Sequence, residues 1–217
     1  MLVNTNFASV SYGNAPERIP RRVPRERLAW RRCAPSAKSF APAACAPYKR
    51  ARMTANQMFT EMSPALAVRI VEEVHASDKD LYRVALVSVA QAKKVRPMFL
   101  ERQAKAERFR TMAVALRRSD LQMVAGNVLS GWLVKNQQPL LIDFLTALDI
   151  PHQNGVVETL PATVEDQKLH DAVELLLGKN TPEVVGLYLR AFHDMNEADW
   201  PNLKKILSED VRLMLGA

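Results

Sequence analysis

Apolar residues recur three and four positions apart along most of the chain after residue 52, a spacing that places them on one face of an α-helix. Phe109, Met112, Ala113 and Leu116 show this pattern most clearly. No segment alternates apolar and polar residues for long enough to form a strand. The pattern therefore predicts an all-α domain over residues 53–217, either a helical bundle or a short stack of helical hairpins with about seven or eight helices.

Capping residues predict where several of these helices begin and end. Ser63, followed by a proline, and Asp78 have the side chains expected of N-caps. Thr163 with Asp166 three residues later resembles a capping box, and Gly178 is placed as a C-terminal cap of the helix that follows. The helix after Asp78 is expected to carry its apolar residues at positions 81, 84, 86 and 87.

Two predicted helices are apolar around most of their circumference, and we expect neighbouring helices to cover them on most sides. The first spans residues 140–148. The second spans residues 184–195, and its main polar edge is formed by Gly186, Arg190 and His193. Trp132 lies in the middle of the apolar stripe of another helix and is predicted to be buried in the core.

Three helix junctions share a pattern: a lysine, two or three further residues, a proline and then an apolar run. The prolines are Pro97, Pro139 and Pro182, which are 42 and 43 residues apart. This spacing falls within the length range of HEAT and armadillo repeats, so a stack of helical hairpins is one hypothesis. The alternative is an irregular bundle that uses lysine at helix C-termini and proline in first turns. Outside the junctions the three units do not match well, and both hypotheses stay open.

Residues 1–52 differ from the rest of the chain in composition. They hold eleven basic and two acidic residues, a net charge of +9, and six of the thirteen prolines. Prolines this frequent interrupt any helix, so we expect a disordered leader. Three interpretations remain open: upstream sequence ahead of a true start at Met53, a basic tail that contacts phosphate backbones, or an organelle transit peptide.

The charge of the leader changes how the high isoelectric point is interpreted. Residues 53–217 carry 19 basic and 21 acidic residues, a net charge of −2, so the isoelectric point near 9.6 does not describe the domain. Both cysteines, Cys33 and Cys45, lie in the leader, which excludes disulfides and thiolate metal sites from the domain. No apolar run is long enough to span a bilayer. We expect a cytoplasmic protein without membrane contact, unless a translated leader directs it to an organelle.

One stretch of the domain, residues 93–118, is strongly basic. It has nine basic and two acidic residues, whereas residues 119–217 carry a net charge of −7. Clustered lysines and arginines bind polyanions by releasing counterions, so this stretch is a candidate nucleic-acid or polyanion surface. A solvated helix face explains it more simply, because only Phe99 and Phe109 are available to stack on bases. The candidate residues are Lys93, Lys94, Arg96, Arg102, Lys105, Arg108, Arg110, Arg117 and Arg118.

A second set of candidates lies in the loop predicted after residue 149, where Gln153-Asn154-Gly155 indicates a tight turn. Loops often carry functional residues, and a convergence of these side chains would suit a hydrolase or metal enzyme. A polar surface loop explains them more simply. The loop candidates are Asp149, His152, Asn154 and Glu158.

Motifs for common enzyme chemistries are missing from the sequence. It contains no Walker loop, GxSxG elbow, GxGxxG or HExxH motif, and its seven glycines leave little backbone to enclose a phosphate. His170 has Asp166 and Glu174 four residues to either side, which ordinary surface charge explains without a metal. We therefore expect no cofactor, no metal and no catalytic residue.

These observations favour a non-enzymatic helical interaction or scaffold module that binds another, unidentified protein. The expectation rests on the fold class and on the missing catalytic motifs. Binding of nucleic acid or another polyanion through residues 93–118 is the first alternative. A hydrolase or metal enzyme that uses the loop at residues 149–158 is the second.

Overall fold

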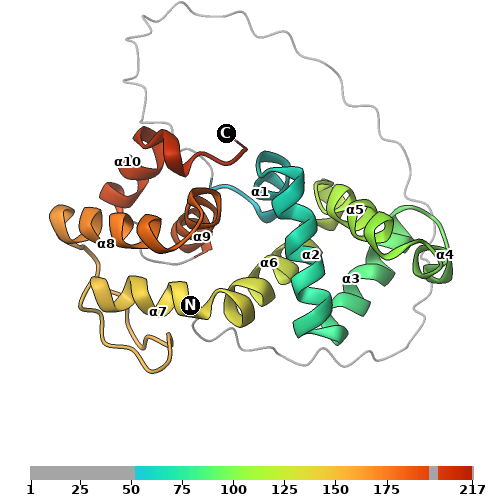
Figure 1. Cartoon of the computed structure of the whole chain (residues 1–217), viewed down its shortest axis with the longest axis horizontal. Coiled ribbons are helices and arrows are strands. Elements are labelled where there is room, and N and C mark those ends of the chain that lie inside the picture. The colour runs from blue at the N-terminus through green and yellow to red at the C-terminus, as the bar shows by residue number, and fades with distance from the viewer. Residues whose placement is uncertain (1–51, 196–199, 217) are drawn as a thin grey trace, which may run out of the picture. The chain divides into compact units, whose positions relative to one another are not determined.

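The computed structural model describes residues 52–195 and 200–216, so the predicted leader lies outside the described residues except for Arg52. Within these ranges the chain is all-α, as predicted, and forms no strand (Figure 1). In this part of the chain no helix is long and apolar enough to cross a membrane. The elements are α1 (Ala55–Glu61), α2 (Pro64–Ser77), α3 (Lys79–Ala92), α4 (Pro97–Glu101), α5 (Lys105–Ala115), the 3-10 helix η1 (Ser119–Leu121), α6 (Gln122–Asn136), α7 (Gln138–Ala147), α8 (Asp166–Lys179), α9 (Pro182–Met195), α10 (Pro201–Glu209) and the 3-10 helix η2 (Val211–Leu213).

The described residues form ten α-helices, more than the seven or eight expected, because short helices escape a periodicity argument. Helix α1 has seven residues and α4 has five, too few to repeat an apolar spacing. Local hydrogen bonds support α1 instead, since the backbone N–H of Thr54 donates to Oε1 of Gln57 over 2.8 Å. Met58 and Phe59 then anchor this helix in the core.

Two predicted N-caps are confirmed, and both also contact distant helices. Ser63 Oγ accepts the N–H of Leu66, while the carboxylate of Glu183 in α9 accepts both the N–H and the hydroxyl of Ser63, over 2.6 and 2.8 Å. Asp78 accepts the N–H of Leu81 at 3.0 Å and the ammonium of Lys135 at 2.7 Å. The bond from Lys135 is the main reason why the pKa of Asp78 lies below its usual value.

The capping pattern predicted for α8 is wrong at both ends. The residue before the helix is Glu165, whose side chain makes no capping bond, and Asp166 accepts instead from the amide of Asn202 in α10. Gly178 lies inside the helix, which continues to Lys179. Local sequence favoured a cap here, and a contact with a helix far along the chain replaced it.

Helix α2 lies between α5 and α6, which bury its apolar face together with α3 (Figure 1). Trp132 of α6 is fully buried against this group, as predicted. Its indole N–H donates to Glu73 Oε2 over 2.6 Å, and Arg69 donates to the other oxygen of the same carboxylate over 2.7 Å. Glu73 therefore satisfies a buried donor from a second helix.

Helix α9 is covered on nearly all sides, because residues 184–189 are all buried. The prediction of a polar edge on this helix is wrong. Gly186 packs against η2, where an added Cβ would collide with the carbonyl of Leu213. His193 is buried as well, and Arg190 donates to the carbonyl of Leu207 in α10 over 3.2 Å. The C-terminal segment therefore packs against the edge that the sequence pattern assigned to solvent.

The three prolines of the repeated junctions lie in the first turn of a helix, as predicted: Pro97 and Pro182 are the first residues of α4 and α9, and Pro139 is the second residue of α7. The helices that follow them are unequal, with five residues in α4, ten in α7 and fourteen in α9. The regular spacing of the prolines is therefore not matched by equal helical hairpins.

The predicted turn in the long loop between α7 and α8 is confirmed. Gln153 and Val156 exchange two backbone hydrogen bonds, each 2.9 Å long. Asn154 and Gly155 have φ angles of 53° and 86°. Asparagine followed by glycine is the pair that best tolerates two successive positive φ angles.

Candidate functional site

The nine basic residues of the stretch 93–118 are divided among several environments. Lys105 is 3.3 Å from Glu72, and Arg118 is paired with Asp120 at 2.8 Å. Arg108 donates to the backbone carbonyl of Glu101. Arg117 is half-buried, and its Nε has no hydrogen-bond partner in the described part of the chain. The remaining candidates are exposed and make no ion pair among the described residues: Lys93, Lys94, Arg96, Arg102 and Arg110.

The structure does not arrange these cations as one continuous strip. Arg108 lies on the flank of α5 that faces α2 and α3, whereas Arg110 lies two positions further, about 200° around the helix. Phe109 is buried between them, which leaves Phe99 as the only exposed aromatic ring of the stretch. A surface that follows a nucleic-acid backbone needs aligned cations and stacking rings, and this stretch offers little of either.

The loop candidates are held by different partners. Asp149 pairs with Lys168 at 2.8 Å, and this bond lowers the pKa of Asp149. His152 Nε2 lies 3.1 Å from the hydroxyl of Thr146, and its Nδ1 accepts the N–H of Gly155. Asn154 forms the turn, and Glu158 is exposed. Among the described residues, no hydrogen bond or ion pair joins the four candidate side chains to one another, so the structure does not bring them together as one site.

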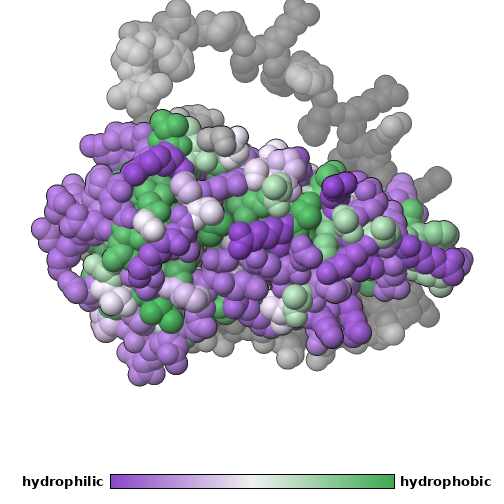
Figure 2. All heavy atoms as spheres, in the orientation of Figure 1, coloured by the Kyte–Doolittle hydropathy of each residue, from purple (hydrophilic) through white to green (hydrophobic). Residues whose placement is uncertain are grey.

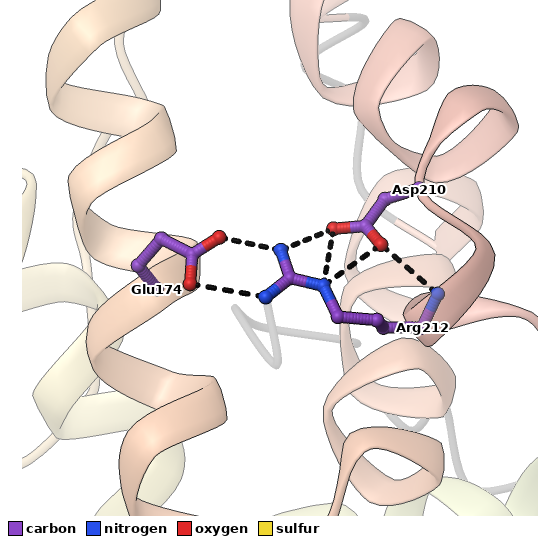
Figure 3. A network of polar contacts seen from close by, with 3 residues as sticks. All are labelled: Glu174, Asp210 and Arg212. Atoms are coloured by element: carbon purple, nitrogen blue, oxygen red, sulfur yellow. Dashed lines mark hydrogen bonds and ion pairs between the residues drawn. The ribbon is translucent and has the colours of Figure 1, made fainter.

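The carboxylates around His170 are also engaged elsewhere. Figure 3 shows Arg212 between Glu174 and Asp210, with its guanidinium bonded to both carboxylates. These bonds are the main cause of the lowered pKa of each acid. The described residues contain no group of three or more His, Cys, Asp and Glu side chains that could hold a metal ion.

A groove of about 510 Å³ lies among α2, α3, α4 and α5, and we call it the basic groove. Tyr82 and Leu86 form a buried apolar floor, and Val87 beside them is 40% exposed. Three cations, one carboxylate and one histidine complete its lining. The lining residues are His75, Lys79, Tyr82, Arg83, Leu86, Val87, Glu101 and Arg108.

Few of the charges in the basic groove are neutralised. Lys79 makes no ion pair within the described residues. Arg83 is 3.7 Å from Asp80, but their side chains are 75% and 94% exposed, so water screens this pair. The pKa of His75 is lowered chiefly by burial and further by the positive charges of Arg108, Lys105 and Lys79, whereas Glu72 raises it. The groove is therefore a region of positive potential.

Exposed apolar side chains accompany this charge. On α3, Val84 is 59% exposed and lies one helical turn before Val87. On and before α4, Val95, Met98 and Phe99 are 40–60% exposed. Figure 2 shows scattered apolar residues within a mostly hydrophilic surface where α4 and α5 lie. Apolar residues ringed by unpaired charge are typical of a protein-binding surface.

Sequence reasoning identified Arg108 through charge clustering but missed the other components of the groove. Val84 and Val87 were counted among the apolar residues of a helix, and the pattern does not say which of its sides stays uncovered. Nothing in the sequence around Tyr82 indicated that it lines a groove. The sequence did offer one signal for the groove, a basic and an apolar residue, Arg83 and Val87, one turn apart on the same helix.

No family model, curated protein or solved structure was found to match the chain.

Proposed function

We propose that the domain is a non-enzymatic interaction module that binds an acidic, apolar-containing segment of a partner protein in the basic groove. The observation that supports this most directly is the composition of the groove, in which an apolar floor lies beneath Lys79, Arg83 and Arg108. A partner helix with apolar anchors and flanking carboxylates would bury its apolar side chains there and meet the unpaired cations.

Binding of nucleic acid is the weaker candidate on the same surface. It is favoured by the exposed, unpaired cations, including Lys93, Lys94 and Arg96. The separation of Arg108 from Arg110 around α5 and the burial of Phe109 count against it.

The test uses a probe peptide whose leucines recur three and four residues apart and whose other positions are glutamate and alanine. A scrambled peptide of the same composition is the control for charge alone, because the full chain includes a basic leader. Fluorescence anisotropy with the full chain should show tighter binding of the probe than of the scrambled peptide. The affinity should fall as salt rises.

A matched pair of variants tests the location. Val87→Glu places a carboxylate in the groove and should reduce binding at least tenfold through repulsion and lost apolar contact. Val114→Glu changes a valine that is 61% exposed on α5 and does not line the groove, so it should bind like the wild type. Equal binding of both peptides, or equal effects of both variants, would contradict the proposal. Tighter binding of duplex DNA or single-stranded RNA that survives Val87→Glu would favour the nucleic-acid alternative.

A further inference from the structure

Three aromatic rings meet at the basic groove, and Arg108 lies over the two that are buried. His75, Tyr82 and Phe109 come from α2, α3 and α5, and their ring centroids are 4.6–6.0 Å apart. The guanidinium carbon of Arg108 lies 6.0 Å from the centroid of Tyr82 and 5.8 Å from that of Phe109. These cation–π contacts hold the guanidinium at one place in the groove.

The hydrogen bonds of Arg108 fix it further but leave donors unused. Its NH1 donates to the backbone carbonyl of Glu101 over 3.0 Å. Its Nε is buried and has no hydrogen-bond partner in the described part of the chain. Burial raises the pKa of the Tyr82 hydroxyl, and the adjacent guanidinium of Arg108 opposes this shift by its charge and by a hydrogen bond to that hydroxyl. The NH2 group of Arg108 makes no hydrogen bond within the described residues, so this end of the guanidinium can donate to an acceptor in the groove.

An oxyanion is the acceptor that suits this arrangement. A guanidinium presents its N–H groups as a planar fork that matches the two oxygens of a carboxylate. The carboxylate of Glu101 lines the groove but forms no ion pair with Arg108, which is held by the backbone carbonyl of that residue. Lys79 and Lys105 reinforce the positive potential that an incoming anion would meet.

We infer that Arg108, fixed on Tyr82 and Phe109, is the anchor for a carboxylate of the partner. This inference rests on the proposed function, because the carboxylate belongs to an aspartate or glutamate of the bound segment. Arg108 forms the fixed part of this subsite, and Lys79 and Arg83 contribute charge without fixed geometry.

The first experiment uses acetate as a probe that needs no partner. Acetate bound at Arg108 would offset the positive charge near His75, so saturating acetate should raise the pKa of His75, measured by NMR on the full chain. Arg108→Gln should abolish the saturable response, and Arg110→Gln should preserve it. A response that persists in Arg108→Gln would overturn the inference. Inorganic phosphate, tested in the same way, shows whether the subsite accepts any oxyanion or prefers a carboxylate.

The second experiment measures binding of the probe peptide to a series of variants. Arg108→Gln should weaken binding about tenfold or more, and Arg108→Lys should restore it only in part, because lysine keeps the charge but lacks the fork. Tyr82→Phe keeps the ring under the guanidinium and removes only the buried hydroxyl, so binding close to that of the wild type is expected. Arg110→Gln is the matched control for charge and should bind like the wild type. Thermal unfolding of each variant shows whether the fold is intact.

The outcomes separate the two proposals. Binding that is lost in Val87→Glu but unchanged in Arg108→Gln keeps the groove as the docking site and overturns the anchor. Equal losses of affinity in Arg108→Gln and Arg110→Gln would indicate diffuse electrostatic attraction, and they would also overturn the anchor role of Arg108. If Val87→Glu has no effect on the peptide, the proposed function fails, and the acetate experiment alone decides whether Arg108 holds an anion.

Discussion

Two glycines inside helices of this chain should respond in opposite ways to the same substitution. Gly178 in α8 is exposed, and no atom lies within 4 Å of a Cβ added there. Gly186 in α9 is buried, and a Cβ would collide with the backbone carbonyl of Leu213 in η2. Alanine stabilises a helix interior relative to glycine by about 0.5–1 kcal/mol, and it does so at either position. At Gly186 this gain is opposed by a steric cost of about 1–3 kcal/mol, because the obstacle is backbone rather than a flexible side chain.

Gly178→Ala should therefore raise the free energy of unfolding by up to about 1 kcal/mol, and Gly186→Ala should lower it by about 1–2 kcal/mol. For a chain of this size each kcal/mol corresponds to about 2–4 °C in melting temperature. Urea and thermal unfolding, followed by circular dichroism at the helical band, measure both changes. If Gly186→Ala were as stable as Gly178→Ala, the close packing of α9 against η2 would be refuted.

Two further changes test other polar contacts of the fold. Glu73→Leu removes the acceptor of the buried Trp132 indole and should lower the free energy of unfolding by about 1–3 kcal/mol. Glu73→Gln keeps an oxygen and should lower it less. Urea unfolding followed by tryptophan fluorescence measures the difference, and equal losses of stability would contradict the role of Glu73. The pKa values of Glu174 and Asp210 are lowered by Arg212, so the stability they contribute is present above their unfolded pKa values and is lost as pH falls through the folded ones. Arg212→Gln should therefore flatten the pH dependence of the melting temperature below about pH 4.5, and an unchanged slope would contradict this.

The parts of the fold that follow from local physics were predictable from the sequence. The apolar face of α5, the caps at Ser63 and Asp78, and the turn at Asn154-Gly155 are all present as expected. Each depends on residues within about one turn of each other, so tertiary context had little to change. The capping box expected at Thr163 failed because Asp166 bonds to Asn202, 36 residues away.

The candidate site depends on arrangements that a linear pattern does not record. Charge clustering included Arg108 and Arg110 alike, yet only Arg108 lines the groove. The difference arises from the rotation of α5 against α2 and α3, which the sequence does not specify. The same holds for Val87, because no helix of the described residues covers that side of α3.

The basic groove holds Arg108 in a fixed position, and the positive potential of the groove affects the pKa of His75. Because the buried rings of Tyr82 and Phe109 hold Arg108, an incoming carboxylate does not have to order a flexible side chain, which reduces the entropic cost of binding. The positive charges that would attract this carboxylate also lower the pKa of His75, while Glu72 opposes them. By linkage, a ligand that offsets these charges must raise the pKa of His75 by the same free energy with which protonation of His75 strengthens binding. Affinity for an acidic segment should therefore increase as pH falls through the titration of His75, and a variant without Arg108 should lose this dependence together with the anchor.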